Sequence, residues 1–309
     1  MLLSALSVAC RGDRAWRLGV VPKGASSTFW QSVYAGAVMA GDDFEGEILW
    51  ESPQEETDVE RQIEIVQSLI GRAVDGIVLA PSDRDGLVPV VEQANEAGIP
   101  VTIFDSGIGT DQYVSYVATD NRAAGELAAE KVADLLENTG NVAMVRHVPG
   151  SDSTDERERG FAEAIAQRFS GIRIAASAYC MSYRDRAFEV SRDMLNAHAD
   201  LGALFCSSEA ATVGAMRALR ALGQEGRVKL VGFDSAFGLQ QGLRDGVVDA
   251  LVVQDPFYIG YAGVKTLVQK LSGVEPPRQI DSPARLITAR NLDDPDIERL
   301  LNPRNVAER

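Results

Sequence analysis

Two aspartates are candidate functional residues, because each directly follows an apolar run. The tripeptide Phe-Asp-Ser occurs at 104–106 and again at 233–235, which places Asp105 and Asp234 at equivalent points of the two halves. In open parallel sheets, ligands bind beyond the carboxyl ends of the strands, so two facing ends can share one cleft. A single aspartate there could simply cap the next helix or turn. The repetition favours two carboxylates directed into a common cleft.

Two large aromatic residues lie at the same edge of the expected first sheet. Phe29 and Trp30 follow a Gly/Ser-rich loop and begin the first expected helix. An aromatic wall beside carboxylates suits a polyhydroxylated ring, which stacks its C–H faces and hydrogen-bonds through its hydroxyls. Apolar contact with a few directed polar groups is typical of small-molecule pockets. The alternative is that the rings fix the helix onto its own lobe, and we expect one of the two to do so.

The elements that must position these residues follow from the hydrophobic pattern, which alternates apolar runs with amphipathic segments. The apolar runs predict strands at 17–21, 47–50, 76–80, 100–104, 141–146, 173–178, 201–206, 228–233 and 250–253. The amphipathic segments predict helices at 29–40, 58–72, 87–97, 154–167, 184–197, 210–222, 237–245 and 258–271, with a short surface helix in the tail 291–309. This order indicates an α/β protein with two similar doubly wound parallel-sheet lobes.

Length and charge limit the possible functions. The chain has 309 residues, 45% of them hydrophobic, which is enough for two domains of ordinary size. Its formal net charge is −15, so it repels phosphate backbones and no nucleic-acid partner is expected.

The three cysteines show no metal-site spacing, and the chain has two histidines, so no metal site is expected. Cys180 and Cys206 adjoin apolar strand residues, and we predict buried thiols there rather than a disulfide. Cys10 follows a short apolar run ending in small residues. Residues 1–15 are therefore interpreted as the remainder of an export or lipoprotein signal with a linker, and Cys10 as a lipid-attachment site.

Two features of the N-terminal segment depart from the lipoprotein pattern: it has no basic start, and Ser7 stands where a leucine is usual. The alternative is a frayed terminus with a chance cysteine. No other segment is apolar for long enough to cross a membrane.

A set of motifs runs through the chain in order. They are Pro-Lys-Gly…Phe-Trp-Gln…Gly within 22–36, Asp105 after its apolar strand, Ala-Thr-Asp-Asn at 118–121 followed by Ala-Gly at 124–125, Arg-Glu-Arg-Gly-Phe at 157–161, Val-Gly-Phe-Asp at 231–234 and Val-Gln at 253–254. Together, from Trp16 to about Arg290, they resemble the ribose-type periplasmic solute-binding proteins.

The resemblance implies the type I periplasmic-binding fold, with two lobes joined by a three-segment hinge. The N-terminal lobe would comprise 16–119 and 253–283, and the C-terminal lobe and tail 120–252 and 284–309. The protein would act in the periplasm or at the cell surface, as a monomer without a cofactor. It would capture a sugar or similar molecule by hinge closure and deliver it to an ABC transporter permease.

Carried over position by position, the resemblance assigns Phe29 and Trp30 to flank a sugar ring, with Asp105, Arg157, Asp234 and Gln254 binding its hydroxyls. Several places differ from the ribose binders: Ser27 and Ser208 replace asparagines, and Ser106 replaces an arginine. A different or larger sugar, or another polyol-like molecule, therefore fits as well as ribose. Lys23 is expected to be solvated rather than to contact an anionic ligand.

The sequence bears on three other functions. A repressor's sensing domain would carry a DNA-binding segment of roughly 50–60 residues, but 15 residues precede Trp16. An enzyme is not expected, because no phosphate loop, dinucleotide fingerprint, nucleophile elbow or zinc-protease motif occurs. The same binding fold could instead report its ligand to a membrane receptor, and the sequence leaves this alternative open.

Overall fold

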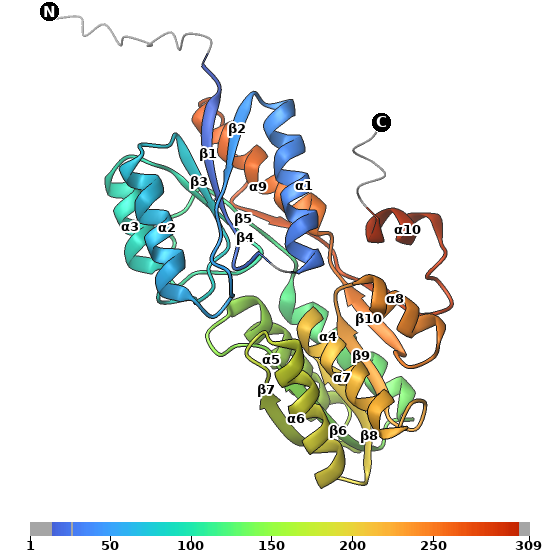
Figure 1. The fold of residues 1–309 in the computed structure, drawn as a ribbon. Helices are drawn as coiled ribbons and strands as arrows, with labels where there is room; N and C mark the ends of the chain where they lie inside the picture. The colour runs from blue at the N-terminus through green and yellow to red at the C-terminus, as the bar shows by residue number, and fades with distance from the viewer. Residues whose placement is uncertain (1–13, 26, 303–309) are drawn as a thin grey trace, which may run out of the picture.

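The structure is a computed structural model that describes residues 14–25 and 27–302. The chain forms two α/β lobes, one from the N-terminal strands and one from the middle of the chain (Figure 1). Each lobe contains one six-stranded sheet. The predicted fold class, two similar parallel-sheet lobes, is confirmed.

The first sheet belongs to the N-terminal lobe and is parallel throughout. Its strands are β1 (Trp16–Val21), β2 (Gly46–Trp50), β3 (Gly76–Leu79), β4 (Val101–Phe104), β5 (Tyr116–Ala118) and β11 (Gln279–Asp281). They lie in the order β11-β5-β4-β3-β1-β2. Every residue of β3 and β4 is buried, as expected for interior strands covered on both faces.

The second sheet repeats this arrangement in the C-terminal lobe. Its strands are β6 (Gly140–Arg146), β7 (Ile172–Tyr179), β8 (Leu201–Cys206), β9 (Lys229–Phe233), β10 (Ala250–Val253) and β12 (Arg285–Ile287). They lie in the order β12-β10-β9-β8-β6-β7, and β12 is antiparallel to β10 at the edge. In both sheets the order reverses beside the first strand of the lobe, which is where doubly wound folds form their crevice.

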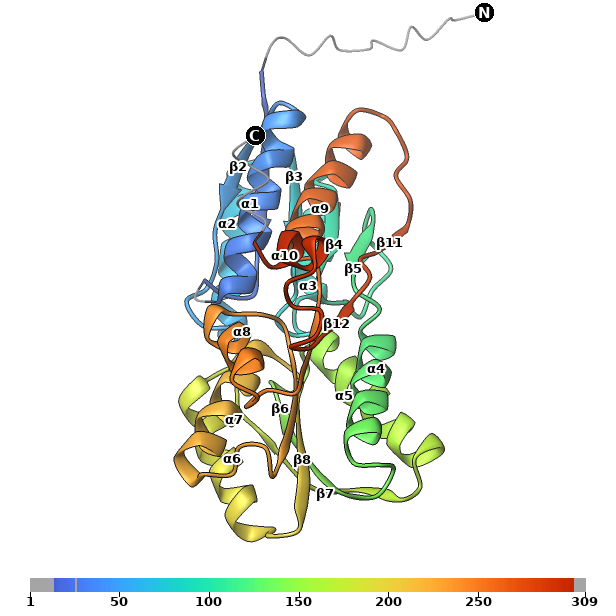
Figure 2. The same ribbon diagram turned by 90° about the vertical axis from the view of Figure 1, so that its right-hand side faces the viewer.

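Helices cover both faces of each sheet, as Figure 1 shows for the first lobe and Figure 2 for the second. They are α1 (Thr28–Asp43), α2 (Val59–Gly71), α3 (Val88–Glu96), α4 (Asn121–Leu135), α5 (Asp152–Arg168), α6 (Arg184–Ala197), α7 (Glu209–Leu222), α8 (Phe237–Arg244), α9 (Pro256–Leu271) and α10 (Pro295–Leu301). In the first lobe, α1 and α9 pack on one face and α2 and α3 on the other. In the second, α4 and α5 share one face, and α6, α7 and α8 cover the other.

Local sequence explains where several helices begin. The side chains of five residues accept a hydrogen bond from a backbone amide of the first turn and so satisfy one of its otherwise unpaired donors. These caps are Ser27, Asp58, Asp120, Ser208 and Asp255. Two of them, Ser27 and Ser208, also lie at the edge of the sheet where the ligand site was predicted.

The chain passes between the lobes three times. It leaves the first lobe between β5 and α4, returns between β10 and α9, and leaves again between β11 and β12. Helix α10 then lies beside the second lobe, where Ile297 joins its hydrophobic core. Three adjacent connections of this kind allow two rigid bodies to rotate about a common hinge.

Each predicted strand and helix is present, and the prediction missed four elements. Helix α4 was missed because its buried face is made chiefly of alanines, which give a weak hydrophobic pattern. Strands β5, β11 and β12 have three residues each and are defined by their partners across the sheet. Cys180 and Cys206 are buried free thiols, as predicted.

Within the described part of the chain, no helix combines the length and apolarity needed to cross a bilayer. The predicted signal segment 1–15 and the predicted lipid-attachment residue Cys10 lie wholly or mostly outside the described residues.

Candidate functional site

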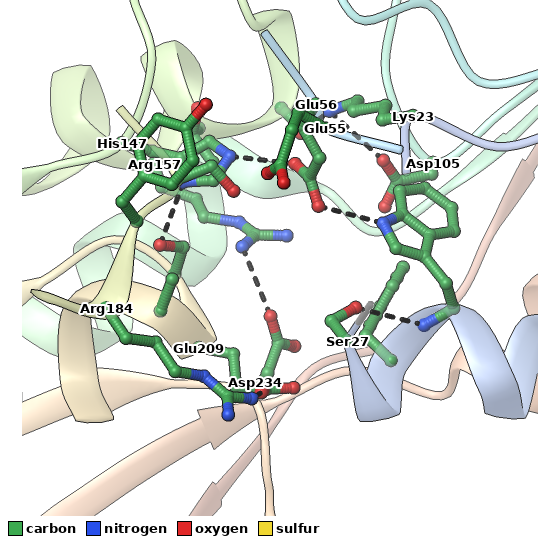
Figure 3. A pocket seen from close by; sticks show the side chains of 18 of the residues that line it. Lys23, Ser27, Glu55, Glu56, Asp105, His147, Arg157, Arg184, Glu209 and Asp234 are labelled. Carbon is green, nitrogen blue, oxygen red and sulfur yellow. Dashed lines mark hydrogen bonds and ion pairs between the residues drawn. The ribbon is translucent and has the colours of Figure 1, made fainter. Parts of the chain in front are cut away.

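A cavity of about 570 Å³ lies between the lobes, with walls from both (Figure 3). All eight residues predicted to bind a ligand line it, although they come from segments spread over more than two hundred positions. They are Ser27, Phe29, Trp30, Asp105, Arg157, Ser208, Asp234 and Gln254. The two carboxylates that follow equivalent strands therefore face one cleft, as the repeated tripeptide predicted.

Asp105 and Asp234 have the same backbone conformation as well as the same place in the fold. Their φ angles are 62° and 60°, in the left-handed region that aspartate tolerates better than most residues. Both side chains are buried. The two strand ends therefore share one local geometry, and both carboxylates line the cavity.

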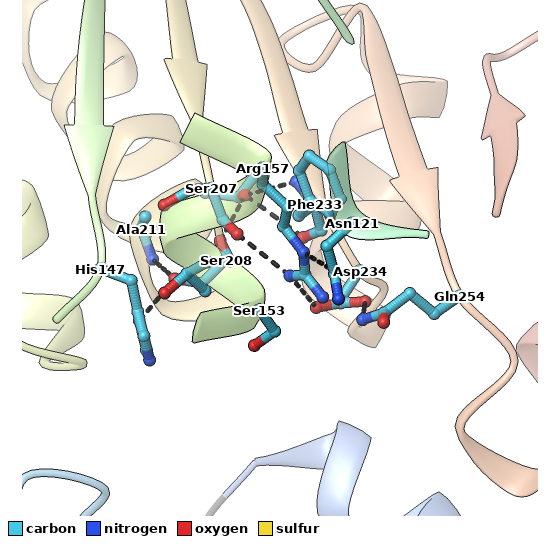
Figure 4. A network of polar contacts seen from close by, with 12 residues as sticks. Asn121, His147, Ser153, Arg157, Ser207, Ser208, Ala211, Phe233, Asp234 and Gln254 are labelled. Carbon is cyan, nitrogen blue, oxygen red and sulfur yellow. Dashed lines mark hydrogen bonds and ion pairs between the residues drawn. The ribbon is translucent and has the colours of Figure 1, made fainter. Parts of the chain in front are cut away.

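Arg157 is held rigidly beside Asp234 (Figure 4). Its Nε donates to Asn121 Oδ1 at 2.8 Å and its Nη1 to the Ser207 carbonyl at 3.1 Å, while Nη1 lies 3.6 Å from Asp234 Oδ2. The guanidinium also stacks over the Phe233 ring, 4.4 Å from its centre. An arginine fixed in this way is a preorganised donor to ligand oxygens.

Asp234 is shared between Arg157 and Gln254, whose Nε2 donates to Asp234 Oδ1 at 2.8 Å. Burial raises the pKa of Asp234, and the Arg157 charge and the Gln254 hydrogen bond oppose that rise. Gln254 Oε1 is buried and has no hydrogen-bond partner among the described residues. This oxygen could accept a hydrogen bond from a ligand hydroxyl.

Lys23 is buried, and the expectation of a solvated lysine was wrong. Its Nζ lies 3.2 Å from Asp105 Oδ2 and donates to Ser151 Oγ at 3.0 Å and Ser153 Oγ at 2.9 Å. The two serines belong to the other lobe, so the lysine spans the cleft. Lys23 thus supplies the cation beside Asp105.

A second polar chain crosses the cleft through His147. The Nδ1 of His147 is 3.0 Å from Ser208 Oγ, and its Nε2 is 2.9 Å from Glu56 Oε2. The other Glu56 oxygen accepts from Trp30 Nε1 at 2.9 Å. The chain therefore runs from an aromatic residue of the first lobe to the cap of α7 in the second.

The two ends of the Glu56–His147 pair hold opposite charges at neutral pH. Burial alone would lower the pKa of His147, but contacts with Cys180 and Glu56 outweigh it and raise that pKa to about 9. Burial would raise the pKa of Glu56, but the hydrogen bond and charge of His147 lower it to about 2. An ion pair thus connects the lobes within the cleft.

Phe29 and Trp30 belong to the core of the first lobe and also form part of the cavity wall. Their rings pack edge to face with centres 4.9 Å apart, and Trp30 packs on Phe104 in the core of the first lobe. Both also line the cavity. Trp30 is the more buried of the two and is fixed by Glu56, so it joins the core to the site.

Several lining residues were not predicted, namely Glu55, Glu56, Tyr183, Arg184 and Glu209, and His147 was expected only at the edge. Each group follows the carboxyl end of a strand: β2, β6, β7 or β8. The rule that ligands bind beyond the carboxyl ends of the strands, which identified Asp105 and Asp234, could therefore have identified these residues too. The described residues contain no group of three or more His, Cys, Asp or Glu side chains that could hold a metal ion.

The two parallel-sheet lobes, the three connections between them and the polar cleft define a bilobal periplasmic binding protein. Residues 18–275 match the family described as periplasmic binding protein domain, and the chain belongs to that family.

Similar proteins are sugar-binding components of transport systems. The chain is 30% identical to the D-ribose/D-allose-binding protein of Pseudomonas aeruginosa over 287 residues, which cover 88% of this chain and 89% of that protein. It is also 30% identical to the ribose import binding protein of Escherichia coli over 213 residues, 69% of this chain and 71% of that protein.

Solved structures of the same class superpose over almost the whole chain. An ABC transporter solute-binding protein from Agrobacterium vitis with bound D-fucose is 36% identical, with a TM-score of 0.90 over 92% of this chain and 99% of that one. A carbohydrate transporter solute-binding protein from Agrobacterium radiobacter in complex with D-arabinose is 29% identical, with a TM-score of 0.91 over 94% and 100%.

Proposed function

We propose that this protein captures a sugar or sugar-like molecule in the cleft between its lobes and delivers it to the permease of an ABC transporter. One observation carries the proposal: two buried carboxylates from equivalent strand ends, Asp105 and Asp234, share a cavity with aromatic rings. That combination matches the apolar faces and the hydroxyls of a sugar ring. The relatives and structural neighbours named above, which bind sugars, support it.

The roles of the residues follow from their fixed hydrogen bonds. Asp105, Asp234 and Gln254 accept hydrogen bonds from ligand hydroxyls, and Arg157 donates to ligand oxygens. Phe29 and Trp30 flank the ring. Ser27 and Ser208 already cap helices, and each retains hydrogen-bonding capacity at the wall of the cleft.

Binding is coupled to closure of the lobes. A ligand that contacts both walls favours the closed arrangement, and only a difference in affinity between the two arrangements can shift their balance. We place the hinge at the three connections, near Thr119, Val253 and Pro283. The N-terminal lobe is then 16–119 with 253–283, and the C-terminal lobe is 120–252 with 284–309.

The setting is the periplasm or the cell surface. The protein acts as a monomer, releases its ligand chemically unchanged and has no catalytic role. Attachment to the membrane, where it occurs, is through a lipid on Cys10. The closed form is the one that the permease recognises.

The test is a thermal-shift screen over pentoses and hexoses, including D-ribose, D-allose, D-arabinose and D-fucose, followed by calorimetry on the best ligand. A ligand at one hundred times its Kd stabilises the folded protein by about 2.7 kcal/mol. We expect a clear rise in melting temperature and recovery of unchanged sugar from the complex. The proposal fails if no carbohydrate raises the melting temperature or if the sugar is converted.

A further inference from the structure

The cavity has two parts that differ in burial. Its inner part, which we call the floor, is formed by Trp30, Asp105, Arg157, Asp234 and Gln254, none of which is more than 7% exposed. Its outer part, which we call the mouth, is formed by Glu55, Tyr183, Arg184, Asp185 and Arg217. Tyr183 is 42% exposed.

The cavity is larger than a single sugar ring requires. A hexose has twelve non-hydrogen atoms, and even at the roughly 30 Å³ that a whole water molecule occupies they would fill at most about 360 Å³. The cavity measures about 570 Å³. A monosaccharide on the floor, between Asp105 and Asp234, therefore leaves the mouth unfilled.

The mouth has the chemistry of a carbohydrate subsite rather than that of a charged-ligand site. Arg217 Nη1 pairs with Asp185 Oδ1 at 2.7 Å, and Arg184 pairs with Glu209. The arginine charges are therefore matched, so an ionic ligand would have to displace an existing pair. The exposed ring of Tyr183 offers an apolar face beside these polar groups, which is the arrangement that a sugar ring recognises.

Glu209 lies at the junction of the two parts. It follows Ser208 of the cleft-crossing polar chain, and one of its carboxylate oxygens accepts from Arg184 of the mouth. The residue is 5% exposed, and its Oε2 is buried without a hydrogen bond of ordinary geometry among the described residues. The Phe29 backbone amide lies near this carboxylate and opposes the rise in its pKa that burial causes. A ligand hydroxyl at the junction would give the buried oxygen a further hydrogen-bond donor.

We infer that the mouth is a second subsite, which binds a further neutral sugar unit or glycosidic substituent attached to the ring on the floor. The ligand class is then a disaccharide or glycoside rather than a free monosaccharide. The outer unit stacks on Tyr183 and hydrogen-bonds to the polar groups around it, with Glu209 receiving a hydroxyl near the linkage. This inference rests on the proposed function.

The experiment compares matched ligands by calorimetry on the full chain. The monosaccharide that raises the melting temperature most is tested beside its methyl glycoside and beside disaccharides that contain it as the reducing or the non-reducing unit. We expect at least one disaccharide to bind at least tenfold more tightly than the monosaccharide, and the methyl glycoside to gain less.

Variants then locate the gain. Tyr183→Ala and, independently, Arg217→Ala should remove most of the disaccharide's advantage while leaving monosaccharide affinity within about twofold. Tyr258→Ala is the matched control, since Tyr258 is 40% exposed on α9 and is not among the residues that line the cavity. It should leave both affinities unchanged.

Three results overturn the inference and are distinguishable. If disaccharides bind no better than the monosaccharide, the mouth is an entrance filled by water, and the proposed function stands. If no carbohydrate binds at all, the proposed function and the subsite fail together. An advantage that survives both mouth variants also contradicts the assignment, because the outer unit would then lie elsewhere.

Discussion

Asp105 and Asp234 occupy equivalent positions, and each has a cationic partner, but the two cations come from different parts of the fold. Each aspartate directly follows a central strand, has a positive φ angle and lies beside a buried cation. Arg157 of α5 lies beside Asp234, whereas Lys23, which follows β1, lies beside Asp105. Each cation offsets part of the desolvation penalty that an unpaired buried charge would carry.

Asp234→Asn keeps the size of the side chain and removes its charge. It leaves Arg157 without a buried counter-ion and weakens an acceptor for ligand hydroxyls. We expect affinity for the best sugar to fall by about 1.5–3 kcal/mol, the range for hydrogen bonds to charged groups. Calorimetry measures the change directly. Asp245→Asn, at an exposed pair with Arg220, is the control and should change affinity by less than about 0.5 kcal/mol.

The Glu56–His147 pair predicts a pH dependence of closure. The pKa of His147 rises from 6.5 to about 9 in the structure, so its stabilising effect is complete below pH 6.5 and is lost as pH rises through about 9. The pKa of Glu56 falls from 4.5 to about 2, so its effect is complete above pH 4.5 and is lost as pH falls through about 2. The pair therefore favours the closed form most between pH 4.5 and 6.5.

Sugar affinity measured by calorimetry should accordingly decline between pH 6.5 and 9. His147→Gln keeps a hydrogen-bonding side chain without the titration, so its affinity at pH 6.5 should be lower and its decline over this interval smaller. Cys180 and Lys23 also face this pair, and neither is altered in the variant. An unchanged slope in His147→Gln would show that other groups cause the pH dependence.

The residues of the site could be predicted where a position just after a strand end determines which way the side chain points. Asp105, Asp234 and the two aromatics follow strand ends and were identified, and the same rule would have found Glu209 and Tyr183. Lys23 could not be predicted, because its burial depends on Ser151 and Ser153, which approach only when the lobes are folded against each other. Contacts between separate lobes leave no local pattern in the sequence.

At the scale of elements, the two lobes share a way of packing helices. Gly36 of α1 and Gly260 of α9 each lie against the backbone of the other helix, too close for a side chain. Gly125 of α4 and Gly160 of α5 do the same in the second lobe. A Cβ on Gly36 would lie 1.9 Å from the Phe257 carbonyl oxygen. This packing fixes the N-terminal ends of α1 and α5, which carry the aromatic pair and Arg157. The helix pairs thus set the position of the site residues.

Gly125→Ala tests this link between packing and site. The new Cβ would lie 2.0 Å from the Arg157 carbonyl oxygen, so α4 and α5 must separate and Arg157 must move. We expect a loss of about 1–3 kcal/mol in stability, the usual result of overpacking, together with weaker sugar binding. Gly238→Ala in α8 meets no atom within 4 Å and should be neutral or slightly stabilising. Chemical denaturation and calorimetry measure the two effects, and equal stabilities for the two variants would contradict the packing argument.

The helices and strands differ in how far their own local sequence predicts them. The interior strands β3 and β4 are apolar throughout and were predicted, because burial on both faces imposes that composition. Helix α4 buries alanines against α5, so its signal is weak in sequence although its packing is tight. Strands β11 and β12 form where the chain returns to each sheet, and their pairing depends on the completed lobes.

For the whole molecule, contacts across the cleft join the two lobes in this structure. Besides the pairs at Lys23 and His147, the Ser153 amide donates to Ser106 Oγ at 3.1 Å, and Arg84 lies 3.4 Å from Asp152. The Arg84 side chain is exposed, so its ion pair contributes little, whereas the bonds of Lys23, Ser153 and His147 are buried or partly buried. We expect a ligand held by both walls to add to these contacts and so to favour closure further.

This balance predicts that the sugar makes the protein more compact. Small-angle X-ray scattering should give a smaller radius of gyration with saturating sugar than without it, because closure brings the lobes together about the three connections. At a sugar concentration between the dissociation constants of the wild type and Asp234→Asn, the wild type should be compact and the variant should remain extended. At saturating concentration the variant should close as well, since its hinge is intact. An identical radius for the wild type in both conditions would mean that the lobes do not move on binding, and the hinge mechanism would have to be abandoned.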